Sequence, residues 1–329
     1  MKVLIFSHES DIDGLGCVVL GKMAFGEIDY VLSPGFKELE PKFREYLDSG
    51  KIYEYDKIFV TDLALYNPSL SRVYSDPNLK NKVLIFDHHA GSLAEGCGVY
   101  DFETIAEIDK EGIKTCGTRL FYEYLCVEGF LEPTNALNEF VELTRLEDVW
   151  EWKNAKEKGI KAHDLAILFN SLGSTEAYIN CIYNKMLNGL LKFTEEEAKI
   201  IQNKKDEYDR LLSGMMSEAE YFNDEFGNFY GIVYASYEYR NELSEYVRRK
   251  NNPYNIDYLI IVALDKGANG QKSYRSIKDV DVNIIALAHG GGGHPAASSV
   301  NITETQKAKS LTLSRKDALK YLADSKYEV

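Results

Sequence analysis

Three short apolar runs near the start of the chain are each followed directly by acidic residues or histidines. The runs 2–6, 57–61 and 82–86 are rich in branched residues, and helical patterns separate them. Strands that alternate with helices predict an α/β fold with a parallel sheet covered on both faces. Ligands of such sheets bind beyond the carboxyl ends of the strands. The residues that follow the three runs are His8, Asp11 and Asp13, then Asp62, then Asp87, His88 and His89.

Carboxylates and imidazoles gathered in one place indicate a divalent transition metal such as Mn²⁺, Fe²⁺, Co²⁺ or Zn²⁺. Six or seven such ligands are too many for one ion, whereas two ions that share a bridging carboxylate would use them all. Two ions about 3.5–4 Å apart hold the attacking and the leaving oxygen in phosphoryl displacement. Each group alone has a simpler explanation, since Asp11 and Asp13 could cap a helix and Asp62 could begin a turn. The arrival of all three groups at one predicted edge favours the metal site.

The remaining chain divides into two further regions. The length of 329 residues predicts about two domains. Residues from about 153 to 220 carry a nearly continuous helical pattern with charged faces, and a second α/β pattern starts near Phe229. We therefore predict a parallel-sheet domain over 1–155, a helical connector over 156–220 and a smaller C-terminal α/β domain over 221–329.

The C-terminal region contains two motifs that suit phosphate binding. Gly290 to Gly293 are consecutive glycines before His294, and glycine lets the backbone approach a ligand closely and present N–H groups to an anion. Arg275 lies in the string SYRS, and a guanidinium grips phosphate oxygens as a fork. A flexible linker and a surface ion pair are the ordinary alternatives. The predicted substrate-binding residues are Gly291, Gly292, Gly293 and His294, whereas for Arg275 alone a surface ion pair is the better explanation.

Composition narrows the class of partner. The formal net charge of −14 argues against coating of long nucleic acids through a broad basic surface, but it permits a small phosphorylated substrate in one pocket. The five cysteines include no C-x-x-C pair, so we expect a reduced, cytoplasmic setting and no disulfide scaffold or structural zinc site. No apolar run approaches the roughly 20 residues of a membrane span, and the N-terminus lacks a cleavable signal pattern.

In this order, the motifs resemble those of the DHH phosphoesterase family with its C-terminal DHHA1 domain. Residues 87–89 (DHH) match the motif that names the family, residues 8–14 (HESDIDG) match its first motif, and Asp62 matches its second. The fourth motif is an Asp after a long helix, for which Asp148 is the candidate beside Glu147. The string SYRS and the glycine run match the DHHA1 motifs, and this resemblance adds Arg275 to the predicted substrate-binding residues. The opening string SHESDIDGLGCVVLGKMAFG is most similar to the branch that degrades very short RNAs, the nanoRNases.

The resemblance implies a role for each of these residues. One metal ion would be held by His8, Asp11 and Asp62. The other would be held by Asp13, Asp62, His88 and Asp148, with Asp62 as the bridge. Asp87 would orient the histidines of the site, and His89 would face the scissile phosphate, where it would stabilise charge or protonate the leaving oxygen. The implied cofactors are two divalent metal ions of the Mn²⁺ type.

The implied activity is metal-dependent exonucleolytic hydrolysis of short RNA or DNA oligonucleotides to nucleoside monophosphates by an activated water. Three alternatives stay open. They are a phosphodiesterase for cyclic or linear dinucleotides, a phosphatase for 3′-phosphoadenosine 5′-phosphate, and a nucleotide-binding module without catalysis. The resemblance also leaves a homodimer open. Trp150 and Trp152, which follow the fourth motif, are expected to be packing residues.

Overall fold

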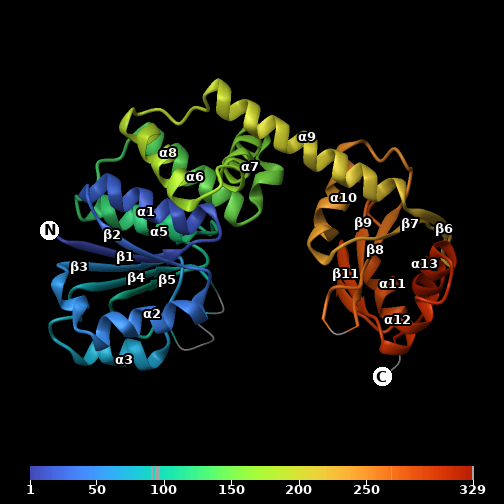
Figure 1. Ribbon diagram of the computed structural model, residues 1–329, viewed down its shortest axis with the longest axis horizontal. Coiled ribbons are helices and arrows are strands. Elements are labelled where there is room, and N and C mark those ends of the chain that lie inside the picture. Colours follow the sequence, from blue (N-terminus) through green and yellow to red (C-terminus); the bar gives the residue numbers. More distant parts are fainter. Residues whose placement is uncertain (90–91, 93–96, 268, 328–329) are drawn as a thin grey trace. The chain divides into compact units, whose positions relative to one another are not determined.

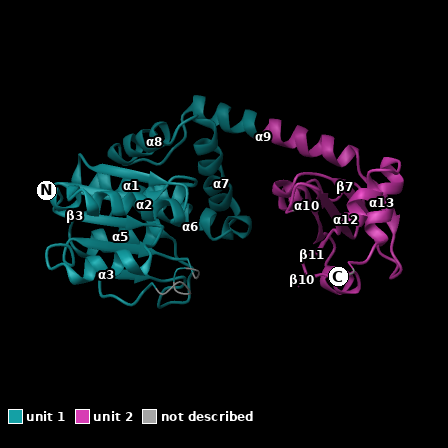
Figure 2. Ribbon diagram, turned by 60° about the horizontal axis from the view of Figure 1, so that its bottom comes forward, with its two compact units in different colours: residues 1–204 teal, residues 205–329 magenta. Residues whose placement is uncertain are grey.

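The computed structural model describes residues 1–89, 92, 97–267 and 269–327. The chain forms two compact units, Met1–Lys204 (unit 1) and Lys205–Val329 (unit 2) (Figure 2). The division lies inside the long helix α9 (Glu195–Ser217), not near residues 155 and 220, the borders expected from the sequence. In the described part of the chain, no helix is both long and apolar enough to cross a membrane.

Unit 1 contains a five-stranded sheet in the order β2-β1-β3-β4-β5, in which all neighbours are parallel. The strands are β1 (Val3–His8), β2 (Asp29–Ser33), β3 (Lys57–Thr61), β4 (Val83–Asp87) and β5 (Glu103–Ile105). The chain runs outward from β1 to β2 and then crosses back to β3, so the strand order reverses between β1 and β3. Such a reversal opens a crevice beyond the carboxyl ends of the strands. The predicted α/β fold class with a parallel sheet is confirmed.

Helices cover both faces of this sheet (Figure 1). One face packs against α2 (Phe36–Asp48), the 3₁₀ turn η1 (Lys51–Glu54) and α3 (Asn67–Ser75), with Phe43 and Leu70 in the core between them. The other face packs against α1 (Ile12–Phe25) and α5 (Gly117–Val127). Residues 12–21 of α1 are all buried, because further helices cover its outer side. A helix that is apolar all round belongs inside a core.

The helices after α5 include those expected to form a connector. They are α6 (Asn135–Asp148), η2 (Glu151–Asn154), α7 (Lys156–Ser171) and α8 (Thr175–Leu187). Leu165 of α7 and Ile182 of α8 are fully buried in the same core as α1. These two helices therefore belong to unit 1, and only α9 joins the units. Their charged outer faces gave them the sequence pattern of a solvent-exposed connector.

Unit 2 contains a mixed six-stranded sheet in the order β10-β11-β9-β8-β7-β6, in which only β7 and β8 are parallel neighbours. The strands are β6 (Glu220–Asn223), β7 (Phe229–Tyr234), β8 (Tyr258–Ala263), β9 (Gln271–Ser276), β10 (Gly292–His294) and β11 (Ala297–Asn301). The helices are η3 (Tyr237–Tyr239), α10 (Arg240–Arg249), α11 (Val282–Ala288), α12 (Glu304–Ser310) and α13 (Arg315–Asp324). Val247 of α10 packs on one face, and Ile285 and Leu319 pack on the other. This unit confirms the predicted second α/β segment.

Lys272 of β9 is fully buried, and its Nζ donates hydrogen bonds to the carbonyls of Leu322 and Ser325 at the end of α13. Burial lowers the pKa of this ammonium from 10.5 to about 8. Between these two values the unfolded chain binds more protons than the folded one, so this residue makes the protein more stable as the pH rises. We compare the wild type with Lys272→Met, which has no titrating group at this position. Between pH 7.5 and 10, we expect the free energy of unfolding of the wild type to rise by up to about 3 kcal/mol relative to that of the variant. Urea unfolding of both proteins across this range measures the difference, and parallel curves would contradict it.

Candidate active site

The first motif surrounds the turn from β1 into α1. Asp11 caps α1, because its Oδ1 accepts hydrogen bonds from the backbone N–H groups of Asp13 and Gly14 at 3.1 and 3.0 Å. Its other oxygen, Oδ2, lies 2.7 Å from Nδ1 of His8. The simple capping explanation therefore holds for one oxygen, and it fixes the direction in which the second oxygen points. The carboxylate of Asp11 can therefore cap the helix with one oxygen and hold a metal ion with the other.

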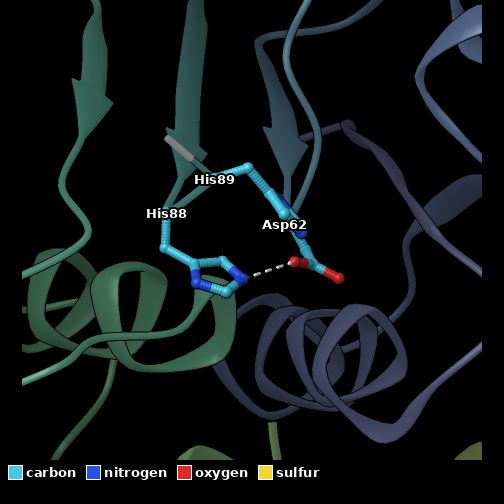
Figure 3. Close-up of side chains that lie close together, drawn as sticks. All are labelled: Asp62, His88 and His89. Carbon is cyan, nitrogen blue, oxygen red and sulfur yellow. Dashed lines mark ion pairs between the residues drawn. The ribbon is translucent and has the colours of Figure 1, made fainter. Parts of the chain in front are cut away.

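Among the described residues, three groups of potential metal ligands lie at this edge of the sheet, and two of them share no residue and form two clusters. The first cluster consists of His8, Asp11 and Asp62, and the second of Asp13, His88 and Asp148; within each, the ligand atoms lie within 4.8 Å of one another. Asp62 faces both clusters. Its Oδ2 lies 3.5 Å from Nδ1 of His8, and its Oδ1 lies 3.4 Å from Nε2 of His88 (Figure 3). One carboxylate with one oxygen toward each cluster is the geometry expected of a bridging ligand.

Several polar atoms in these clusters are buried without a hydrogen-bond partner among the described residues. They include both carboxylate oxygens of Asp62, Nε2 of His88 and Oδ2 of Asp148. Nε2 of His88 lies 3.4 Å from this oxygen of Asp148 and 3.8 Å from Oδ2 of Asp13. Buried polar atoms are almost always satisfied, and one cation in each cluster would satisfy these atoms. The donor set of imidazole and carboxylate fits a divalent transition metal.

The electrostatics of the clusters also favour the binding of cations. Burial and the neighbouring charge of Asp13 raise the pKa of Asp62, and the same two causes raise the pKa of Asp148 to about 9. Burial disfavours the charged form of His8, but hydrogen bonds and charge from Asp11 and Asp62 outweigh burial and raise its pKa to about 11. Carboxylates that repel one another in a buried site are stabilised by bound cations.

Asp13 is held in place from the opposite side by α5. Its Oδ2 accepts a hydrogen bond from the backbone N–H of Gly117 at 2.6 Å, and its Oδ1 accepts one from Thr118 at 2.8 Å. These donors belong to the first turn of α5, where the helix dipole favours a negative charge. A Cβ at Gly117 would lie 2.7 Å from Cβ of Asp62, so only glycine lets α5 approach both carboxylates.

Asp87 is the buried last residue of β4. Its carboxylate forms hydrogen bonds with the residues that follow it and belongs to neither cluster. Its Oδ1 accepts a hydrogen bond from the backbone N–H of His88 at 2.8 Å and lies 2.7 Å from Nδ1 of His89. Oγ of Ser92 donates to its other oxygen. The hydrogen bond to Asp87 raises the pKa of His89. A ring nitrogen of His89 also lies within 4.8 Å of ligand atoms of Asp62 and His88, although the side chain is half exposed.

No model of a known protein family matches the chain. Over 303 residues it is 32% identical to the oligoribonuclease NrnB of Bacillus subtilis (strain 168), a match that covers 91% of this chain and 73% of NrnB. Two solved structures share the fold at 14% identity. One is the DHH domain of a protein described as belonging to a family of ribosomal proteins, with a TM-score of 0.50 over 99% of this chain and 87% of that one. The other is the pGpG-specific phosphodiesterase PggH of Vibrio cholerae, with a TM-score of 0.51 over 99% and 100%.

The chain belongs to the DHH phosphoesterase family. Its DHH motif begins at the last residue of β4, its first motif begins at the last residue of β1, and Asp62 of its second motif directly follows β3. These are neighbouring strands of one parallel sheet, which explains how motifs separated by tens of residues supply ligands to the same clusters.

The fourth DHH motif left a choice between two adjacent acidic residues, and the structure distinguishes them. Asp148, the last residue of α6, faces His88. Glu147 points elsewhere, with its Oε1 3.1 Å from Nδ1 of His163. The structure thus brings Asp148, and not Glu147, to the second cluster.

The two tryptophans after Asp148 differ in their surroundings. Trp152 fits the expectation of a packing residue, because its ring stacks on that of His163 with centroids 4.1 Å apart. Trp150 does not, since it is 55% exposed and its φ of 62° lies in the left-handed region. Bulky residues rarely adopt this conformation, and such strain is concentrated at functional sites. In the sequence, the signal that could single out Trp150 is its position two residues after Asp148, but the sequence does not reveal that its side chain is exposed.

The DHHA1 motifs lie in unit 2. Arg275 of β9 donates from Nε to Oδ1 of Asn241 at 3.1 Å and from Nη1 to the carbonyl of Tyr274 at 2.9 Å, and it has no ion pair with a described carboxylate. The glycine run ends in β10, which pairs with β11 through Gly293 and Ser298. A Cβ at Gly291 would lie 2.1 Å from the carbonyl oxygen of Ser299. Close backbone packing within unit 2 therefore requires some of these glycines. A Cβ at Gly292 would meet nothing closer than Cδ2 of Leu287 at 3.8 Å, and His294 is exposed.

Proposed function

We propose that this chain is a metal-dependent phosphodiesterase that hydrolyses short oligonucleotides to nucleoside monophosphates. The observation that carries the proposal is the position of Asp62, whose two oxygens face two separate ligand clusters. Two metal ions with one shared carboxylate suit displacement at phosphorus. The relationship to an oligoribonuclease supports an oligonucleotide as the substrate.

The clusters supply a complete ligand set for two ions, of which Mn²⁺ fits the mixed donors. We assign His8, Asp11 and Asp62 to one ion, and Asp13, Asp62, His88 and Asp148 to the other. When bound, the ions would lower the pKa of a water held between them and neutralise charge on the phosphate.

The protein's own side chains carry the remaining steps of the proposed reaction. His89 would contact the scissile phosphate and donate a proton to the leaving oxygen. Asp87 would hold the imidazole of His89 in position through the 2.7 Å contact at Nδ1, as a carboxylate behind a catalytic histidine does. In unit 2, Arg275 would grip a phosphate, and Gly291, Gly292, Gly293 and His294 would bind the phosphate or base of the released nucleotide. The cysteine pattern supports a cytoplasmic location. A homodimer remains a prediction.

Product analysis with purified protein and Mn²⁺ tests this function. The substrates are labelled RNA and DNA oligomers from two to about twenty-four residues, a cyclic dinucleotide and 3′-phosphoadenosine 5′-phosphate, each with an EDTA control. We expect rapid conversion of RNAs of two to five residues to monomers, and no turnover in EDTA. Cleavage of only the cyclic dinucleotide or the monoester would assign a different substrate to the same metal site. No turnover of any substrate would favour a nucleotide-binding module instead.

A further inference from the structure

Two basic side chains in unit 2 meet at one tyrosine ring. The guanidinium carbon of Arg240 lies 3.9 Å from the ring centroid of Tyr237, and Nζ of Lys266 lies 4.1 Å from it. Arg240 also donates a hydrogen bond from Nη1 to the backbone carbonyl of Tyr237 at 2.9 Å. Cation–π contacts at these distances hold a basic side chain in place. The ring therefore fixes two positive charges beside each other.

The topology of unit 2 explains why these residues meet. Tyr237 opens η3 and Arg240 opens α10, both shortly after β7, whereas Lys266 follows β8. The strands β7 and β8 are parallel neighbours, so the segments that follow them emerge at the same edge. That edge is the place where parallel strands present ligand-binding residues.

Arg275, the DHHA1 arginine, belongs to the same group of charges. Its Nε donates to Asn241, the residue after Arg240. Burial lowers the pKa of Arg275, and the charge of Arg240 lowers it further, whereas Tyr237 and Glu242 offset part of this effect. The hydrogen bond to Asn241 thus places Arg275 next to the start of α10, where Arg240 lies.

No carboxylate neutralises these cations at close range. Within the described ranges, no acidic side chain forms an ion pair with Arg240, Lys266 or Arg275, although the chain has 52 acidic residues against 38 basic ones. The adjacent Asp265 instead accepts a hydrogen bond from the backbone N–H of Tyr237 at 3.1 Å. Three cations that lack a carboxylate partner among the described residues of an acidic protein indicate an anionic ligand, and guanidinium and ammonium groups together suit phosphate.

We propose that Tyr237, Arg240 and Lys266 form a phosphate-binding subsite beside Arg275. This subsite binds a second phosphate of the oligonucleotide. This inference rests on the proposed function, because Arg275 is there assigned the first phosphate. Since two cations already contact the ring of Tyr237, the subsite recognises charge instead of stacking a base. The second phosphate is either a 5′-terminal monoester or an internucleotide diester, and both have the same recognition chemistry.

The test compares two double variants that remove the same charge from the same region. The first is Arg240→Gln with Lys266→Gln. The matched control is Arg249→Gln with Lys250→Gln at the other end of α10, where both side chains pair with Asp209. Binding is measured in EDTA with pNpN, NpN, NpNpN and pNpNpN, and kcat and KM are measured with Mn²⁺.

For the first variant we expect at least about a tenfold rise in Kd and KM for pNpNpN with little change in kcat, because the lost contacts stabilise substrate and transition state alike. The control is expected to change less than twofold. If the first variant binds pNpN more weakly than the wild type does but binds NpNpN equally well, the second phosphate is a 5′-phosphate. The reverse result would identify a diester. If wild type and first variant bind all four oligomers equally, the subsite is refuted and the proposed function stands. If the wild type neither binds any of them in EDTA nor cleaves them with Mn²⁺, both are refuted.

Discussion

Replacing Asp62 with asparagine is expected to lower kcat/KM by at least about a thousandfold. In the proposed bridging position, Asp62 directs one oxygen to each ligand cluster, and an amide could not supply the charge that two cations require. Loss of metal-ion catalysis costs several kcal/mol of transition-state stabilisation, and each 1.36 kcal/mol is a factor of ten in rate. Steady-state kinetics with the short oligomers that the wild type cleaves measures the loss.

The fold of Asp62→Asn is expected to survive, because the substitution keeps the shape and removes a buried negative charge that Asp13 repels. Addition of Mn²⁺ should raise the melting temperature of the wild type more than that of the variant, since ligands stabilise in proportion to their affinity. Asp101→Asn is the matched control, because the side chain of Asp101 is 73% exposed and lies 3.6 Å from Nζ of Lys80. Turnover by Asp62→Asn at the rate of this control would show that Asp62 does not bridge two ions.

Replacing Gly14 with alanine is expected to destabilise the protein by about 1–3 kcal/mol, as overpacking of a tight site does. A Cβ at this position would lie 2.2 Å from the backbone oxygen of His8 and 2.6 Å from its Cβ. Neither atom belongs to the far end of a flexible side chain, so β1 and α1 must move apart. Because this movement displaces His8 and Asp11 together, we also expect Mn²⁺ binding to weaken at least tenfold.

Gly214→Ala provides the matched control for Gly14→Ala. Gly214 lies inside α9, and a Cβ there would meet nothing within 4 Å. Alanine is favoured over glycine in a helix, so we expect the free energy of unfolding of this variant to be about 0.5–1 kcal/mol higher than that of the wild type. Urea unfolding and calorimetric Mn²⁺ titration of both variants separate the local clash from the general effect of the substitution. Equal stability and equal Mn²⁺ affinity in the two variants would contradict the role assigned to Gly14.

The chemistry of the metal-ligand clusters follows from local sequence. Apolar runs such as Lys57–Thr61 and Val83–Asp87 specify buried strands by composition alone, and a residue directly after a parallel strand must lie at the carboxyl edge of the sheet. The positions of Asp62 and His88 at one edge were therefore predictable. So was the capping geometry of Asp11, which depends on only the next three residues.

Other features depend on how the elements pack. Adjacent residues of a helix point about 100° apart, so the rotation of α6 against the sheet selects Asp148 over Glu147. Burial of α7 and α8 in the core of unit 1 depends on a partner surface formed by α1, far away in sequence. The exposure of Trp150 and the meeting of Arg240 with Lys266 at Tyr237 depend on backbone conformation and on strand pairing. A linear pattern carries residue types and local periodicity, whereas orientation and long-range contact arise only from packing.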